Sequence, residues 1–259
     1  MRQNTKDQFD RREEELSSII PRDYRKTYDI RRILSLVFDQ GSIFEIAKGQ
    51  ARSQVTALAL LNGYPVGVLA NDPRSLGGSF NYAVAEKFQR FIDMCDTFHL
   101  PIVNLVDQPG FSIGLKNEQN GTIRKGVRAS FAIAQATVPM AVIYIRKAFG
   151  VAGAAQHPGS RLGWQYAWPS AKWGNIPAEG GIYAAHKAEI ESAEDPKIYL
   201  EALHKLYRNI ESPFRTAEAF NIEDIIDPKE TRPVLCDWVE IAYEVEKNNL
   251  GVKKRGIRC

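Results

Sequence analysis

Two apolar segments of the chain each run into a glycine-containing turn, and these turns are where the sequence offers chemistry. The segment 101–106 precedes Asp107-Gln108-Pro109-Gly110-Phe111, and the segment 140–145 leads to Lys147-Ala148-Phe149-Gly150-Val151-Ala152-Gly153. Turns of this kind expose main-chain N–H groups. Preorganised N–H groups in a water-poor pocket stabilise a developing oxyanion. The sequence therefore predicts a site built from main-chain donors, with no need for a reactive side chain.

Sequence patterns of side-chain catalysis are absent. The chain contains no G-x-S-x-G elbow of a serine hydrolase and no H-E-x-x-H, Walker A or G-x-G-x-x-G pattern. Serine hydrolysis, zinc proteolysis, P-loop phosphate binding and a Rossmann fingerprint are therefore unsupported. No metal site is predicted.

Several residues near these turns admit two interpretations each. Asp107 is either a general base or a residue that caps its turn. Gly77 and Gly78 either approach a ligand closely or make a simple turn. His157 either contacts a ligand or is an ordinary loop residue. Four aromatic residues form either a packed corner of the core or a groove wall for a flat ring: Trp164, Tyr166, Trp168 and Trp173.

Composition limits the class of protein. The 259 residues are 44% hydrophobic, enough for one large domain or two small ones, and the net charge of +3 gives no sign of a nucleic-acid partner. Cys95, Cys236 and Cys259 are an odd set without C-x-x-C spacing, which predicts neither a disulfide framework nor a zinc site. The charged start of the chain and the lack of a long apolar run predict a cytoplasmic protein that does not span a membrane.

The sequence pattern around the two turns predicts an α/β protein, whose strands and helices must position these turns. Asn62-Gly63 between apolar runs predicts a β-hairpin, and helices are expected around 33–37, 84–98 and 123–134. The last of these is expected to bury Ile123, Val127, Phe131 and Ala134. Uniformly apolar strands are typical of sheets covered on both faces.

Both ends of the chain differ from this central part. Residues 1–20 predict a charged, exposed N-terminal arm, and 21–259 a single domain. Toward the C-terminus, one helix is expected to bury Leu200, Leu203, Leu206 and Ile210, and another to bury Leu235 and Trp238. A short strand is expected near 222–226.

These residues together resemble the C-terminal domain of the carboxyltransferase subunit of biotin-dependent acyl-CoA carboxylases. The resemblance extends over most of the chain, and the order and spacing of its pieces make it specific. It rests on positions 20–21, 28–31, 62–67, 87–95, 100–102, 107–111 with Gly114, Gly121 and Gly126, 138–139, 146–150, 166–171 and 225–232.

The resemblance implies a crotonase-like fold, a spiral of β-β-α units with flanking C-terminal helices. It implies transfer of a carboxyl group between carboxybiotin and an acyl-CoA, with main-chain oxyanion holes in place of a side-chain base. The donors would be the amides of Val151 and Ala152 after Gly150. Biotin would contact the residues Pro109, Gly110, Phe111, Gly114, Phe149 and Ala154.

The resemblance also implies partners. The family's N-terminal half, which holds coenzyme A, is not part of this sequence, so another domain or chain would supply it. Biotin would arrive on a biotin carboxyl carrier protein, which a biotin carboxylase charges, and the assembly would be built on trimers. In a eukaryote the mitochondrial matrix would be the alternative compartment. A biotin-dependent acyl-CoA decarboxylase and a non-catalytic assembly subunit are the alternative functions.

The chain departs from the family pattern at three places, the last of which is a pair of residues. Val151 replaces the usual second glycine of its turn and requires a negative φ. Ala154 stands where some members carry a polar residue that tunes the choice of acyl group. Ile176-Pro177 replaces a Met-Gly pair and removes one N–H donor.

Overall fold

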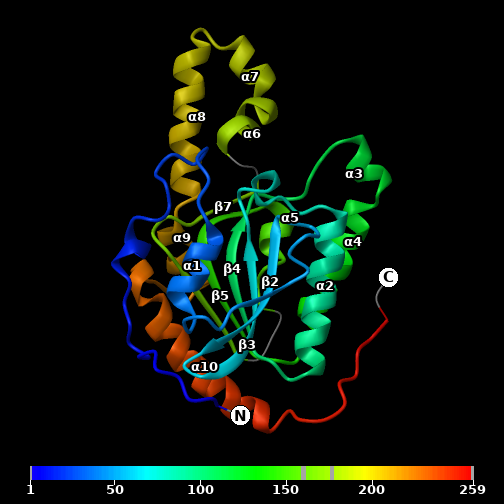
Figure 1. The fold of residues 1–259 in the computed structure, drawn as a ribbon. Helices are drawn as coiled ribbons and strands as arrows, with labels where there is room; N and C mark the ends of the chain where they lie inside the picture. Colours follow the sequence, from blue (N-terminus) through cyan, green and yellow to red (C-terminus); the bar gives the residue numbers. More distant parts are fainter. Residues whose placement is uncertain (1, 159–161, 176–177, 258–259) are drawn as a thin grey trace.

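The computed structural model describes residues 2–158, 162–175 and 178–257, and its centre is a mixed β-sheet (Figure 1). The strand order is β1-β2-β3-β4-β5-β6-β8, with β7 paired to β5 beyond the end of β6. The first two pairings are antiparallel, and all others are parallel. The strands are β1 (Phe44–Ile46), β2 (Gln54–Leu61), β3 (Tyr64–Asn71), β4 (Ile102–Gln108), β5 (Met140–Phe149), β6 (Gly163–Ala167), β7 (Lys172–Gly174) and β8 (Asp224–Ile225).

Helices cover both faces of this sheet, as the uniformly apolar strands predicted (Figure 1). The α-helices are α1 (Ile30–Val37), α2 (Tyr82–Thr97), α3 (Leu115–Gln119), α4 (Thr122–Gln135), α5 (Gly150–Ala154), α6 (Ala178–Ala185), α7 (Lys187–Ser192), α8 (Pro196–Ile210), α9 (Pro213–Glu218) and α10 (Thr231–Lys247). Side chains of α1 and α10 belong to one hydrophobic core, and those of α2 and α4 belong to the other.

The predicted hairpin is confirmed at Asn62-Gly63. Both residues have positive φ, 50° and 77°, as a two-residue type I′ turn requires, and Leu61 pairs directly with Tyr64. The twist of this turn matches the twist of its strands, so β2 and β3 stay paired along their full length. The short strand near 222–226 is confirmed as β8.

Helix α4 exists where it was predicted, but the prediction of its buried face is wrong. Ile123, Val127 and Phe131 are 52%, 42% and 47% exposed. The buried positions are instead mostly small: Thr122, Gly126, Ala129, Ala132 and Ile133. A Cβ added at Gly126 would lie 2.3 Å from the Phe111 ring, so a small residue is needed for this close packing.

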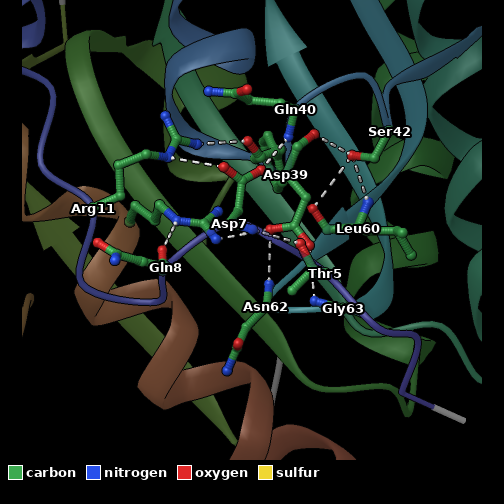
Figure 2. A network of polar contacts seen from close by, with 12 residues as sticks. Thr5, Asp7, Gln8, Arg11, Asp39, Gln40, Ser42, Leu60, Asn62 and Gly63 are labelled. Atoms are coloured by element: carbon green, nitrogen blue, oxygen red, sulfur yellow. Dashed lines mark hydrogen bonds and ion pairs between the residues drawn. The ribbon is translucent and has the colours of Figure 1, made fainter.

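The N-terminal arm is exposed over most of its length, as predicted, but it also packs against the body at several points. Leu16 is 2% exposed and joins the core. Gln8 accepts a hydrogen bond of 2.9 Å through its main-chain oxygen from Arg232, which also forms a buried ion pair with Asp39. Figure 2 shows the arm lying across Asp39 and the Asn62-Gly63 turn. The division between residues 1–20 and 21–259 stays a prediction.

The helices toward the C-terminus differ in how much they bury. α10 packs Leu235 and Trp238 into the core, as predicted. α8 forms over the predicted residues, but Leu206 and Ile210 are 53% and 40% exposed, so the predicted burial is wrong. The reason is visible in Figure 1, where α6, α7 and α8 project beyond the end of the sheet.

Candidate active site

The second predicted turn joins the end of β5 to the short helix α5. Gly150 has φ +60°, which lets the chain reverse direction directly after the buried strand. A Cβ at Gly153 would lie 2.4 Å from the main-chain carbon of Ala148, so the backbone of α5 sits tightly on β5. Gly153 therefore fixes the position of the turn, a role that sequence reasoning did not assign to it.

The amides of Val151 and Ala152 lie in the first turn of α5. The first N–H groups of an α-helix have no partner within the helix, and the helix dipole makes this end favourable for negative charge. Val151 is not among the residues with positive φ and occupies a regular helical position in α5. The negative φ that a valine needs at this position is therefore met. Its side chain is 67% exposed, whereas Ala152 is 1% exposed.

The two predicted turns lie side by side. Gln108 of β4 pairs with Ala148 of β5, after a register shift that begins at Val106. A Cβ at Gly110 would lie 3.8 Å from the main-chain oxygen of Phe149. The structure therefore brings Pro109-Gly110 next to Phe149-Gly150. This arrangement follows from the parallel pairing of β4 and β5, whose carboxyl ends meet at the same edge of the sheet.

Phe111 and Gly114 belong to the same loop but do different things. The Phe111 ring packs against Phe80, with ring centroids 5.6 Å apart, and against Gly126 of α4. Its side chain is therefore engaged in the core beneath the loop. Gly114 has φ +104° with no atom within 4 Å of an added Cβ, and it begins α3.

A cavity of about 430 Å³ opens beside α5. Its walls come from the end of β5, from α5, from β7 and from α8 and α9, and they are lined by Ala148, Gly150, Ala154, Trp173, Gly174, Asn175, Ile210, Arg215, Thr216, Ala219 and Asn221. Sequence reasoning named Gly150 and Ala154 but missed Asn175, Arg215 and Asn221. These polar residues lie in later segments of the chain, and no local pattern marks them.

Asp107 is neither an available base nor a turn cap. It is fully buried, and its carboxylate accepts hydrogen bonds from the Tyr28 hydroxyl at 2.9 Å and from Arg146 Nε at 3.0 Å. Arg146 Nη2 lies 2.9 Å from the same carboxylate. Burial, followed by the negative charge of Asp107, raises the pKa of Tyr28 well above its ordinary value. Tyr28, Asp107 and Arg146 thus form a buried network of hydrogen bonds and an ion pair that stabilises the strand ends beneath the two turns.

Gly78 and His157 both have structural roles away from the cavity. A Cβ at Gly78 would lie 2.9 Å from the main-chain oxygen of Asp107, so this glycine serves close packing of backbone. His157 is exposed and hydrogen bonds with the Pro158 oxygen and the Gln165 amide, away from the lining of the cavity. Ile176-Pro177 lies outside the described residues.

The aromatic cluster divides between the two roles considered for it. Trp168 is completely buried, and its indole N–H donates to the Thr231 hydroxyl at 2.9 Å. Trp173 is half-buried, lies against Tyr144 with ring centroids 4.8 Å apart and lines the cavity. Trp168 is therefore part of the core, and Trp173 is part of a groove wall.

Other kinds of site find little support in the described part of the chain. Cys95 and Cys236 are buried free thiols, and Cys259 lies outside the described residues. Within 2–158, 162–175 and 178–257, no three His, Cys, Asp or Glu side chains gather as they would around a metal ion. Over the same residues, no helix is long and apolar enough to cross a membrane.

An α/β sheet of this topology, with a main-chain turn at the carboxyl end of β5, is a crotonase-like fold of the carboxyltransferase type. The family described as the carboxyl transferase domain matches residues 2–257. The chain belongs to this family.

Individual relatives agree with this assignment. The methylmalonyl-CoA carboxyltransferase 12S subunit of Propionibacterium freudenreichii subsp. shermanii is 35% identical over 93% of this chain and 46% of its own length. The carboxyltransferase subunit of propionyl-CoA carboxylase from Haloferax mediterranei is 37% identical over 85% of this chain and 43% of its own length. The methylmalonyl-CoA decarboxylase alpha subunit of Veillonella parvula is 30% identical over 98% of this chain and 48% of its own length.

A solved structure of a transcarboxylase 12S hexamer, with methylmalonyl-CoA and methylmalonic acid bound, superimposes with a TM-score of 0.89 at 33% identity. It covers 100% of this chain and 50% of its own chain. The chain thus spans about half the length of the curated relatives that it matches.

Proposed function

We propose that this chain is one half of a biotin-dependent acyl-CoA carboxyltransferase, with the biotin site at the turn between β5 and α5. The observation that carries the proposal is the start of α5, held against β5 by Gly153 and bordering a cavity of about 430 Å³. Membership of the carboxyl transferase family supports it.

The residues of this turn fit the polar end of biotin. The cavity has the size of ordinary small-molecule sites, and an L side chain at Gly150 would be strained at its φ of +60°. When bound, biotin would supply the carboxyl group to be transferred and a base for the α-proton of the acyl-CoA. The N–H groups of Val151 and Ala152 would donate to its ureido oxygen and hold the negative charge that develops there.

Neighbouring residues would complete this biotin site. Ala154 lines the cavity. Pro109 and Gly110, which lie next to Phe149, would form a wall beside the turn. Phe111 would act by holding the loop in place through its ring, and Gly114 by letting the loop turn into α3. Trp173 would help to exclude water.

The rest of the enzyme would come from other domains or chains. Because the chain spans about half of its relatives, an acyl-CoA-binding carboxyltransferase half would complete the site. A biotin carboxyl carrier protein would deliver biotin, a biotin carboxylase would charge it, and the assembly would be built on trimers. The hexamer formed by the 12S relative supports this arrangement. We place the assembly in the cytoplasm, with the mitochondrial matrix as the eukaryotic alternative.

Substitution of Val151 tests the proposed oxyanion donor. Val151→Pro removes one N–H at a position in the first helical turn where proline is tolerated, and the preceding Gly150 adapts to it. We expect a fall in kcat of about 10²- to 10³-fold for one lost donor. The assay is carboxyl transfer in the assembled enzyme.

Val151→Ala is the matched control, because it shortens the same exposed side chain but keeps the N–H. It should retain nearly full activity. Equal activity of the two variants in a correctly assembled complex would refute the donor role and favour a non-catalytic assembly subunit.

A decarboxylase subunit is the second candidate, favoured by the Veillonella relative that aligns with 98% of this chain. The two candidates use the same half-reaction in opposite directions. Purification of the chain from its own cells with its bound proteins, followed by mass spectrometry, separates them. A biotin carboxylase in the complex indicates carboxylation, and its absence together with a biotinylated carrier indicates decarboxylation.

A further inference from the structure

A second cavity, of about 500 Å³, lies between the β1–β2 connection and α2, the helix that packs against β2 (Figure 1). We refer to it as the α2 cavity. It shares no lining residue with the cavity beside α5, and its size is that of ordinary small-molecule sites. Most of its lining is apolar and comes from Ile46, Ala47, Ala51, Ala83, Phe91 and Met94.

The β1–β2 connection forms one wall of the α2 cavity with strained backbone. Ala47 and Ala51 have φ of 52° and 43°, in the left-handed region that residues with a Cβ rarely adopt. The ammonium of Lys87 holds this segment by donating at 2.7 to 3.1 Å to three main-chain oxygens, those of Ala47, Gln50 and Gln54. Strained segments of this kind cluster at ligand sites and persist where surrounding contacts hold them. This wall is therefore fixed before any ligand binds.

The same ammonium places a positive charge at the cavity without a carboxylate partner. Lys87 is 9% exposed, and among the residues that the structure describes it forms no ion pair. Glu45 acts on it from farther away but is itself paired with Arg31 at 2.7 Å. Burial therefore lowers the pKa of Lys87. Main-chain oxygens satisfy its N–H groups but carry no net charge, so an anion in the cavity would stabilise this ammonium.

Arg90 is the second cation in the lining, and the acidic residues near it on α2 are engaged elsewhere. Glu86, which also lines the cavity, forms an ion pair with Lys125 at 2.7 Å. Asp93 lies 3.5 Å from Arg255. Within the described part of the chain, no carboxylate forms an ion pair with Arg90, whose side chain is exposed at the cavity. A guanidinium in this position can bind carboxylate or phosphate oxygens through two parallel N–H groups.

We infer that the α2 cavity binds a small amphipathic anion, with its head group at Arg90 and its apolar chain against Phe91 and Met94. Two cations at the cavity disfavour a positively charged ligand. The apolar lining disfavours a ligand that is charged along its whole length, because those charges would lose their hydration. A carboxylate or a phosphate on a short alkyl chain has the required chemistry. The inference is independent of the proposed biotin site.

Calorimetric titration of the full chain with octanoate tests this inference. Arg90→Gln should weaken binding about tenfold, because it removes the guanidinium that binds the head group. Arg124→Gln is the matched control: it removes an exposed guanidinium from α4, outside the cavity lining, and should leave affinity within about twofold. Octanol, which lacks the charge, and butyrate, which has a shorter chain, should both bind more weakly than octanoate.

Ala83→Phe tests the apolar part of the site. It places a ring in the cavity and removes no charge, so octanoate binding should be lost. Circular dichroism checks that α2 remains folded. If this variant does not fold, Arg90→Gln at the exposed end of the cavity still decides the question.

Octyl phosphate separates the two sources of an anionic head group. Tighter binding than octanoate would assign the cavity to an alkyl phosphate such as a lipid fragment, and weaker binding to a fatty carboxylate. Undetectable binding of both at millimolar concentration, equal binding of octanol, or unchanged affinity in Arg90→Gln would overturn the inference. Each result is independent of the Val151 assay, so failure here leaves the proposed biotin site standing.

Discussion

At the scale of single residues, the residues that support the two candidate-site turns are better defined than the proposed main-chain donors. Main-chain donors leave no signature in residue type, so the sequence marks their place only through glycines and strand ends. Asp107 illustrates the difficulty. Its position before Gln-Pro-Gly suggested a base or a cap, and its pairing with Arg146 depends on a residue 39 positions later. No local pattern contains that information.

The Asp107–Arg146 pair gives a prediction about stability. Asp107→Asn leaves the buried guanidinium of Arg146 without its counter-charge, and removing one partner of a buried pair costs about 3–5 kcal/mol. We expect a loss of that size in the free energy of unfolding, measured by urea denaturation. Glu86→Gln breaks the exposed pair with Lys125 and should cost less than about 1 kcal/mol. Similar losses in both variants would contradict this account.

Asp96 gives a prediction about pH. Burial acts to raise its pKa, but hydrogen bonds from Thr137 and the charge of Arg255 outweigh burial and hold the pKa below its ordinary value. A carboxyl with a depressed folded pKa stabilises the protein above the unfolded pKa of about 4, and this contribution is lost as pH falls through the folded value. Stability should therefore fall on acidification partly through Asp96.

The measurement compares Asp96→Asn with the wild type by urea unfolding at pH 6 and at pH 3. The difference in free energy should be larger at pH 6 and shrink at pH 3. Glu194→Gln, a change at an exposed carboxylate between α7 and α8, should show no such trend. A difference that stays constant between the two pH values would contradict the assignment.

At the scale of elements, the sequence identified α1, α2, α4, α8 and α10 and most of the strands, but it missed the other five described α-helices and did not show which helix faces are buried. Asn62-Gly63 specified its hairpin because the turn conformation depends on those two residues alone. For α4, the large apolar side chains indicated one face, while the buried face consists mainly of Gly126, Ala129 and Ala132, whose small size lets the helix approach its neighbours. Small residues add little to hydrophobic periodicity, so packing that depends on them cannot be read from it.

The contact between α5 and β5 gives a prediction at this scale. Gly153→Ala places a Cβ 2.4 Å from Ala148 backbone, so the helix must move away from the strand. Overpacking of this kind costs about 1–3 kcal/mol and should also reduce biotin binding by displacing the amides of Val151 and Ala152. Gly49→Ala, where nothing lies within 4 Å of an added Cβ, is the control and should be nearly neutral. Unchanged stability and binding in Gly153→Ala would show that the turn tolerates this shift.

At the scale of the whole molecule, the chain has a complete hydrophobic core on each face of its sheet and still contains only part of the proposed enzyme. The cavity of its proposed biotin site lies between α5, β7 and the end of α8. We therefore expect the domain to fold without the proposed acyl-CoA-binding half, and catalysis to require that half. This separation allows stability and activity to be tested independently.

The separation predicts that the isolated chain folds cooperatively and binds biotin but does not carboxylate propionyl-CoA. Activity should appear when an acyl-CoA-binding half is added, and it should rise with the concentration of that half until the complex is saturated, as mass action requires. The measurement is transfer of labelled carboxyl from carboxybiotin across such a titration. The Val151→Pro variant should saturate at the same concentration with a much lower plateau, because it loses a donor and keeps the binding surface. Full activity of the chain alone would show that both halves of the chemistry reside in this domain.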